Sequence, residues 1–331
     1  MAGLRDHRLS RDVTDQDQKK ACVLPEGRCE NTPMVIAIVV TYQPGLVVLG
    51  RLLDAIRDQV SRTIIVDNGS TIDVRGFLAG RNAQGIQCLP LGSNHGVAAA
   101  QNVGIAWARE QGASFVILFD QDSIPEPDMV ALLHRTYQRK TDEGFRVAAV
   151  GPRYVDDRNP ARASFSRMSG MRMLVEDCTA KKEGVLVDFV ISSGALISLK
   201  ALSHVGCMNE ALFIDQIDIE WGLRAKSLGY QSFGAHDAVM THSLGEAPLR
   251  ILGRKLLNHS PLRHYYIVRN AIWLISRSYT PLGWQLYFAR MILVRYLLYP
   301  LWVAPRLVYL TMMTKGLWHG LWGRLGKFES S

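Results

Sequence analysis

The hydrophobic positions in the first half of the chain predict strands that alternate with amphipathic helices. Residues 34–41 form a continuous apolar, β-branched run, which is typical of a strand buried on both faces. Leucines and an isoleucine then recur at helical spacing within residues 46–60. We expect further strands at 63–67, 86–91, 115–120 and 147–150, and helices at 97–109 and 125–139. This order predicts an α/β fold, with a mostly parallel, Rossmann-like central sheet and helices on both faces.

The second half has weaker patterns, with short strands expected at 187–191 and 238–241 and a helix at 217–227. Residues 286–314 are strongly apolar but contain three arginines and two prolines. A spanning helix needs roughly 20 apolar residues, and each central arginine costs about 2.5–3.5 kcal/mol in a bilayer. We therefore favour an amphipathic segment lying in the membrane interface, with a packed helical subdomain or a true span as alternatives.

The positive charge is concentrated at the C-terminal end. The 331-residue chain has a net charge of +8, and from Arg250 onward it has twelve Lys or Arg residues and a single acid, Glu329. The preceding part, with 26 bases and 29 acids, is close to neutral. A basic and apolar tail favours contact with an anionic membrane surface over a purely solubilising role, and we expect no nucleic-acid partner.

Five scattered cysteines without metal-ligand spacing are typical of reduced thiols in a cytosolic protein. The first thirty residues are charged and show no signal peptide. We expect a mobile extension at residues 1–32, a catalytic domain at 33–275 and a helical, membrane-associating region at 276–331. The predicted location is cytoplasmic, peripheral on the inner face of the cell membrane.

Polar or acidic residues follow three of the predicted strands. These strand ends are Thr41-Tyr42, Asp67-Asn68 and Asp120-Gln121-Asp122. Ligands in such sheets bind beyond the carboxyl ends of the strands, so the three groups should converge. Two carboxylates separated by one residue can hold Mg²⁺ or Mn²⁺ that bridges a diphosphate. Taken alone, each feature also fits a turn or a helix cap.

Three later groups add candidates. Asn94 and Gly96 precede a helix with small residues that contains Asn102, which suits either close nucleotide approach or simple capping and packing. Asp215, Asp218 and Glu220 lie within six residues, where one carboxylate could act as a general base or all could favour the start of a helix. His242 is a possible metal ligand, although a lone histidine is more often structural.

Seven segments taken together resemble the family 2 glycosyltransferases of GT-A fold. They are residues 39–42, 66–70, 94–102, 119–123, 191–194, 212–221 and His242. The series is most similar to that of bacterial rhamnosyltransferases, and residues 258–270 (NHSPLRHYYIVRN) resemble a segment of that subgroup. The likeness covers about residues 34–275.

The resemblance implies an inverting, metal-dependent transferase and assigns roles to residues. Asp67 would bind the nucleoside, Asp122 and His242 would ligate the metal, and Asp218 matches the catalytic base. Ile217 stands where the family commonly has Glu, so the choice of base between Asp218 and Asp215 stays open. The expected nucleotide-sugar and diphosphate side comprises Thr41, Tyr42, Asp67, Asn68, Asn94, Gly96, Asn102, Asp120 and Gln121, with Asp120 also near the metal. The expected donor-sugar and acceptor side comprises Ser193, Gly194, Asp215, Glu220 and Trp221.

We therefore expect transfer of L-rhamnose from dTDP-L-rhamnose to a hydroxyl of a lipid-linked saccharide or glycolipid, in cell-envelope polysaccharide (O-antigen) or rhamnolipid synthesis. Another family 2 enzyme that uses a UDP-sugar is the nearest alternative. A sugar nucleotidyltransferase would need a basic, glycine-rich loop after the first strand, and residues 41–45 contain no Lys or Arg. A non-catalytic membrane-associated binding protein is the remaining alternative.

Overall fold

The computed structural model describes residues 33–81, 85–155, 164–177, 184–242, 249–251, 254–256 and 259–329. The expected N-terminal extension, residues 1–32, lies outside the described residues.

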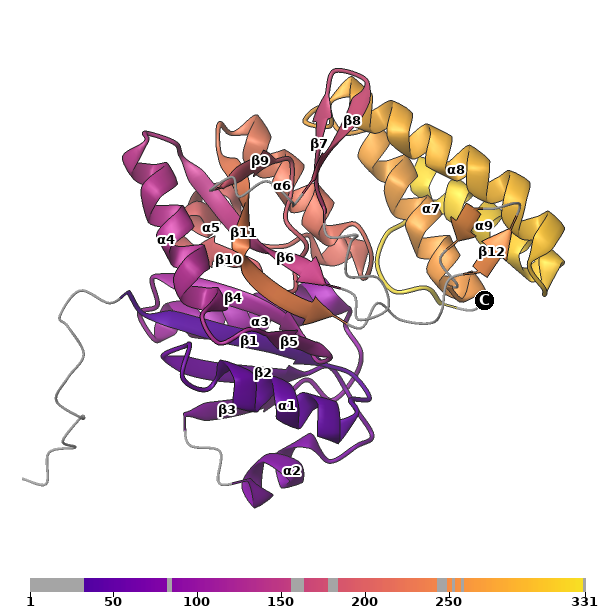
Figure 1. Ribbon diagram of the computed structural model, residues 1–331. Coiled ribbons are helices and arrows are strands. Elements are labelled where there is room, and N and C mark those ends of the chain that lie inside the picture. Colours follow the sequence, from indigo (N-terminus) through magenta and orange to yellow (C-terminus); the bar gives the residue numbers. More distant parts are fainter. Residues whose placement is uncertain are drawn as a thin grey trace, which may run out of the picture. The chain divides into compact units, whose positions relative to one another are not determined.

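The central sheet contains nine strands of the described chain (Figure 1). They are β1 (Val35–Thr41), β2 (Arg62–Asp67), β3 (Ile86–Pro90), β4 (Phe115–Asp120), β5 (Ser123–Pro125), β6 (Val147–Val155), β9 (Val185–Val187), β10 (Leu196–Ser198) and β11 (Gln231–His242). Their order is β3-β2-β1-β4-β10-β6-β11-β5, and β9 also pairs with β11. The strands β3, β2, β1, β4, β6 and β11 run in one direction, and β10, β5 and β9 run against them. The predicted mostly parallel sheet is confirmed.

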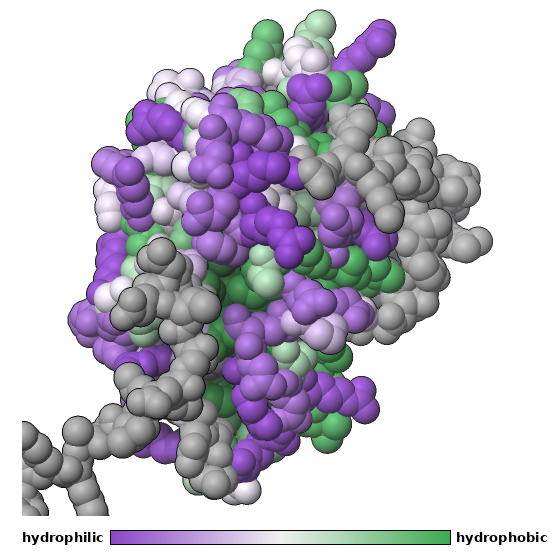
Figure 2. All heavy atoms as spheres, turned by 60° about the vertical axis from the view of Figure 1, so that its left-hand side comes forward, coloured by the Kyte–Doolittle hydropathy of each residue, from purple (hydrophilic) through white to green (hydrophobic). Residues whose placement is uncertain are grey.

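Helices cover both faces of this sheet, as the alternating pattern predicts. One face packs against α1 (Leu46–Ile56), α2 (Val74–Gly80) and α4 (Met129–Asp142). The other packs against α3 (Val97–Glu110), α5 (Leu199–Val205) and α6 (Ile217–Ser227). Within β1, Ala37 and Val39 face the first layer and Ile36 and Ile38 the second, all with 0% exposure. The surface in Figure 2 is mainly hydrophilic with hydrophobic residues between, as expected outside such a core.

Several of the expected elements differ in their bounds, and the strand expected at 238–241 is only the end of β11 (Gln231–His242). The helix expected from residue 125 begins at Met129, because Pro125 pairs with Met240 of β11 in the short strand β5. The strand expected at 187–191 ends at Val187. The next residue, Asp188, turns into the interior and binds groups from three other elements instead of continuing the sheet.

The C-terminal region is a packed set of helices. These are α7 (Pro261–Ile275), α8 (Leu282–Trp302) and α9 (Arg306–Leu321), which share one apolar cluster with Met168 and Leu223. The expected apolar segment 286–314 is therefore two helices joined by residues 303–305. Among the residues that the structure describes, no helix is long and apolar enough to cross a bilayer.

Short elements complete the described chain. Two hairpins, β7 (Ser164–Ser169) with β8 (Arg172–Asp177) and β12 (Leu249–Ile251) with β13 (Arg254–Leu256), lie outside the central sheet. A single 3₁₀ turn, η2 (Glu210–Leu212), precedes the loop that leads into α6. Trp284 of α8 donates to Asp188 at 2.9 Å, which ties the C-terminal helices to the sheet domain.

Candidate active site

The structure brings the three predicted strand ends to one edge of the sheet. Thr41 of β1 pairs in register with Asp67 of β2, and Val40 pairs with Asp120 of β4. Because these strands are parallel neighbours, their carboxyl ends deliver a hydroxyl and two carboxylates to the same place. This is the convergence that the sequence predicts.

Asp67 is almost fully buried and is held by the turn that follows it. Its carboxylate accepts a hydrogen bond from the Thr41 hydroxyl at 3.0 Å and from the hydroxyl and backbone N–H of Ser70. Gly69 in that turn has φ +85°, and a Cβ there would come within 2.5 Å of the Ser93 backbone. The turn and the segment that leads to Asn94 therefore lie in direct contact.

Asn68 and Asn94 form a small amide network beside Asp67. The Asn68 side chain donates to the Asn94 Oδ1 at 3.2 Å and accepts from the His95 N–H at 2.9 Å. The Asn94 Oδ1 also accepts from the Gly96 N–H at 2.9 Å. These bonds fix the backbone of residues 95 and 96 just before α3, so both asparagines hold the segment that leads into this helix.

Gln121 links the ends of two neighbouring strands. Its amide accepts from the backbone N–H of Tyr42 at 2.8 Å and donates to the Tyr42 carbonyl at 3.2 Å. The Tyr42 ring is 47% exposed at this edge. Since both polar atoms of the Gln121 amide bond to backbone, this residue orients the segment between Asp120 and Asp122.

Ser193 and Gly194 lie beside the end of β4, where the sequence places them. The Asp120 N–H donates to the Ser193 hydroxyl at 3.0 Å, and that hydroxyl bonds to the buried Ser123 hydroxyl at 2.7 Å. The Gly194 N–H donates to the Leu118 carbonyl at 2.6 Å. Gly194 has φ +75°, and a Cβ there would come within 2.6 Å of the Pro152 ring, so a larger residue does not fit.

The residues expected to hold a metal lie near the end of β4 and at the end of β11. Asp120 and Asp122 flank Gln121 at the end of β4, and β11 places His242 opposite Ser123, one residue beyond Asp122. The side chain of His242 lies outside the described residues. Within the described part of the chain, no cluster of three His, Cys, Asp or Glu residues has metal-binding geometry. Two hard carboxylate ligands and an adjacent imidazole position suit Mg²⁺ or Mn²⁺.

Asp218 lies in the first turn of α6, close enough to Asp120 for the two charges to interact. Burial raises the pKa of its carboxyl from 3.8 to about 6. Hydrogen bonds from the backbone N–H groups of Ile219 and Asp218 oppose that rise in pKa, and the charges of Asp215 and Asp120 add to it. A carboxylate with a raised pKa is a better proton acceptor than an ordinary aspartate. Asp218 also lines a small cavity with Trp221 and Val190.

Tyr154 is a site residue that the sequence reasoning missed. Its hydroxyl donates to the carbonyls of Ile191 and Ser193, and burial with the charges of Asp120 and Asp218 raises its pKa well above 10. It supports the loop that carries Ser193 from the side opposite β4. The sequence predicts a strand that ends at residue 150. In the structure β6 continues for five more residues, to Val155, and carries Tyr154 toward this edge.

Asp215 is held in an ion pair. Arg263 of α7 donates through Nε at 3.1 Å and through Nη2 at 3.0 Å to its carboxylate. The side chains of Asp215 and Arg263 are 14% and 44% exposed. Because two guanidinium bonds occupy this carboxylate, Asp215 is less suited than Asp218 to take a proton.

Three other predicted residues are engaged in structural contacts. Glu220 is 1% exposed, binds Arg224 through both carboxylate oxygens and accepts from the Tyr279 hydroxyl. Asn102 bonds to the backbone of Met208 through both ends of its amide. The Trp221 indole donates to a backbone carbonyl at 2.8 Å. The structure therefore does not bring the Glu220 carboxylate or the Asn102 amide to the open edge, while one side of Trp221 borders the cavity beside Asp218.

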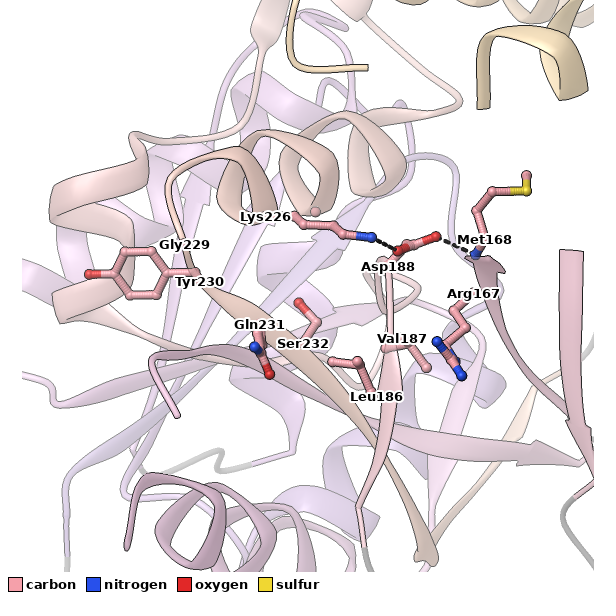
Figure 3. A pocket seen from close by; sticks show the side chains of 11 residues that line it. Arg167, Met168, Leu186, Val187, Asp188, Lys226, Gly229, Tyr230, Gln231 and Ser232 are labelled. Atoms are coloured by element: carbon pink, nitrogen blue, oxygen red, sulfur yellow. Dashed lines mark hydrogen bonds and ion pairs between the residues drawn. The ribbon is translucent and has the colours of Figure 1, made fainter. Parts of the chain in front are cut away.

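A cavity of about 150 Å³ is lined by residues of α6 and of the strands β7, β9 and β11 (Figure 3). Asp188 projects between the Lys226 ammonium, at 2.6 Å, and the Met168 N–H, also at 2.6 Å. None of the predicted site residues lines this cavity. Because its lining comes from these elements, the cavity lies away from the carboxyl ends of β1, β2 and β4.

Comparison with known proteins decides the family. The family model described as glycosyl transferase family 2 matches residues 36–206. The chain is also 33% identical over 253 residues to the dTDP-rhamnosyl transferase RfbF of Shigella flexneri, which covers 75% of this chain and 82% of that protein. The chain belongs to the family 2 glycosyltransferases. It is therefore an enzyme, and the two alternatives of a nucleotidyltransferase and a non-catalytic binding protein are set aside.

Solved structures show the same fold. S. aureus TarS 1–349 matches with a TM-score of 0.54 at 11% identity, covering 88% of this chain and 82% of that chain. GalNAc-T7, crystallised with UDP, GalNAc and Mn²⁺, matches with a TM-score of 0.53 at 12% identity and covers 74% of this chain. This chain spans about half (51%) of the length of that GalNAc-T7 chain. The likeness confirms the GT-A fold of this glycosyltransferase.

Proposed function

We propose that this glycosyltransferase transfers L-rhamnose from dTDP-L-rhamnose to a hydroxyl group of a lipid-linked saccharide or glycolipid. The observation that carries the donor is the 33% identity to a dTDP-rhamnosyl transferase over three quarters of the chain. The geometry supports transfer from a nucleotide sugar in general, because four carboxylates lie at or near the carboxyl edge of the sheet. These are Asp67, Asp120, Asp122 and Asp218.

The donor side of the proposed site is the edge formed by β1, β2 and β4. The buried Asp67 carboxylate, fixed by Thr41 and Ser70, would accept hydrogen bonds from the base or ribose. Asp122, Asp120 and His242 would hold Mg²⁺ or Mn²⁺, which when bound neutralises the charge that develops on the departing diphosphate. The solved structure of GalNAc-T7, which shares the fold, is a complex with UDP, GalNAc and Mn²⁺, and this agrees with the proposed metal.

Asp218 is the proposed base. The acceptor oxygen attacks the anomeric carbon of rhamnose from the face opposite the diphosphate, the bond from that carbon to the diphosphate oxygen breaks, and the hydroxyl proton passes to Asp218. This single displacement inverts the anomeric configuration. Asp218 is favoured over Asp215 because its pKa is raised to about 6, whereas Arg263 holds the Asp215 carboxylate.

A transfer assay tests this function. The full chain with Mg²⁺ and a polyprenyl-diphosphate saccharide should release dTDP and form a rhamnosylated product, detected by mass spectrometry. Asp122→Ala should lose most of this activity. The control variant Asp58→Ala, which removes an exposed carboxylate just after the end of α1, should keep it. Turnover with UDP-hexoses in place of dTDP-L-rhamnose would contradict the donor assignment and favour the UDP-sugar alternative.

The C-terminal helices offer a surface for the proposed membrane contact. In α8, Leu286, Leu293, Leu297 and Leu301 are 46–62% exposed and recur on one side of the helix. Its opposite side is also apolar and buried, and a helix that is apolar all round is typical of a buried or membrane environment. The exposed bases Arg290, Arg306 and Lys315 have no acid near them in sequence, because none occurs between Arg250 and Phe328.

Sedimentation with lipid vesicles tests the membrane proposal. Deleting residues 280–331 would expose the buried face of α7, so surface substitutions are the better probe. Leu297→Ser with Leu301→Ser should weaken binding to vesicles that contain anionic lipid, and Val47→Ser, at a more exposed position on α1, should not. Unchanged vesicle binding by the double variant would exclude this surface.

A further inference from the structure

The loop that leads into α6 has an unusual backbone. Phe213, Asp215 and Gln216 have φ values of +66°, +65° and +62°, and none of them is glycine. Side chains of L-residues disfavour this region, so such a run persists only where the surroundings hold it in place. The 213–216 loop ends two residues before Asp218, and its shape therefore fixes where that carboxylate lies.

Two side chains of α7 hold the 213–216 loop and the turn before it. The Asn270 Nδ2 donates to the carbonyls of Leu212 at 3.1 Å, Ile214 at 2.8 Å and Asp215 at 3.0 Å. The Arg269 Nη2 donates to the Leu212 carbonyl at 2.8 Å. Both residues are 0% exposed. Because one amide group binds three carbonyls within residues 212–215, it directly stabilises the curved backbone of this segment.

The other contacts of the loop connect both halves of the proposed site. The Phe213 carbonyl accepts from the Val97 N–H at 2.8 Å, and thereby caps the start of α3 beside the nucleotide side. A Cβ at Gly96 would come within 2.6 Å of that carbonyl. From the other side, Arg263 of α7 binds the Asp215 carboxylate. The loop thus joins α3, α6 and α7.

We propose that Asn270, with Arg269, is a positioning residue that places Asp218 for catalysis by holding the strained 213–216 loop. This inference rests on the proposed role of Asp218 as the base. It also gives a physical role to the 258–270 segment, whose last two residues are this pair. Asn270 binds the carbonyls of Leu212, Ile214 and Asp215 but not the Phe213 carbonyl that caps α3, so the expected effect is mainly on turnover and only slightly on nucleotide binding.

The test measures kcat, KM and the dissociation constant of dTDP for the full chain with Asn270→Ala. We expect kcat to fall roughly 100-fold, because a displacement of about 1 Å at a reacting group has an effect of this size. The dissociation constant of dTDP should change less than about twofold. Asn270→Ser, which keeps one donor, should lose about tenfold in kcat and remains informative if the alanine variant does not fold.

Val268→Ala is the matched control, because Val268 is also 0% exposed on α7 but packs only within the apolar C-terminal cluster. It should lower the melting temperature and leave kcat close to the wild-type value. A wild-type kcat in folded Asn270→Ala or Asn270→Ser, while Asp218→Ala is inactive, would overturn the positioning role alone. Full activity of Asp218→Ala would instead overturn the proposed base, so the two failures are distinguishable.

Discussion

Replacing Asp218 with asparagine should stabilise the enzyme at neutral pH while removing its activity. The wild-type carboxyl has a pKa of about 6 in the folded protein and 3.8 in a model peptide, mainly because it is buried. Ionisation is therefore less favourable in the folded than in the unfolded chain, and the folded protein loses stability as the pH rises from about 4 to about 6. A shift of this size corresponds to about 3 kcal/mol at 1.36 kcal/mol per pKa unit.

The expected magnitude between two accessible pH values follows from linkage. At pH 5 the folded carboxyl is mostly protonated and the unfolded one mostly ionised, and at pH 8 both are ionised. The free energy of unfolding of the wild type should therefore fall by about 1.4 kcal/mol from pH 5 to pH 8 relative to Asp218→Asn. Taking the difference between the two proteins cancels the titration of the groups that they share.

Urea unfolding at both pH values, with a chelator present to keep the site metal-free, measures this difference. Asp54→Asn is an informative control, because the Arg81 guanidinium lowers the pKa of the exposed Asp54 carboxyl. The stability of that variant relative to the wild type should stay constant between pH 5 and pH 8, because a carboxyl with a pKa at or below 3.8 is ionised in both the folded and the unfolded chain at these pH values. A stability difference between wild type and Asp218→Asn that is independent of pH, or that grows in favour of the wild type at pH 8, would refute the reasoning about Asp218.

Three further predictions concern residues around the site. Gly69→Ala should lower the free energy of unfolding by about 1–3 kcal/mol and weaken dTDP binding measured by calorimetry. The reason is that Gly69 has φ +85° and that a Cβ there would collide with the Ser93 backbone. An unchanged dTDP affinity would contradict this prediction. Glu220→Ala should lower the free energy of unfolding in urea by about 3–5 kcal/mol, because Arg224 loses its carboxylate partner. The variant should keep the wild-type kcat per folded molecule, and a loss of kcat would instead indicate that Glu220 contacts the acceptor. The transfer rate should fall about tenfold per pH unit below about 6, since Asp218 must be ionised to accept a proton; a flat profile from pH 7 to 5 would exclude it as the base.

The elements with strong patterns were predictable from the sequence. The helix at 217–227 has the predicted bounds, and the predicted strands at 63–67, 86–91 and 115–120 differ from β2, β3 and β4 by at most one residue at either end. The three-residue strand β10 was not predicted, because it is too short to show a period. Its antiparallel position between β4 and β6 depends on tertiary pairing alone.

The candidate site was predictable where strand ends carry it. Asp67 and Asp120 converge because parallel strands bring their carboxyl ends together, which a local pattern can indicate. Glu220 shows the limit, since an acid in the first turn of a helix looks the same whether it faces a cleft or binds Arg224 and Tyr279 in the interior. The contacts of Asn270 with the 213–216 loop join residues more than 50 positions apart, and no local pattern reports them.

The C-terminal helices show a further limit of prediction from the sequence. An apolar stretch interrupted by arginines is compatible with a membrane interface and with a packed subdomain. The structure shows packing on one side of α8 and exposed leucines on the other, so it confirms the packed subdomain and leaves the membrane contact a proposal for the exposed face. Periodicity could not separate them, because both faces are apolar.

The most direct test of the central account is the turnover of Asp218→Ala with dTDP-L-rhamnose, Mg²⁺ and a lipid-linked acceptor. Single-turnover transfer and the dissociation constant of dTDP should be measured on the same preparation. The account predicts a transfer rate lower by about 10²–10⁴-fold with nucleotide affinity unchanged, which is the effect expected for loss of a general base. Transfer at the wild-type rate by a variant that binds dTDP normally would contradict it.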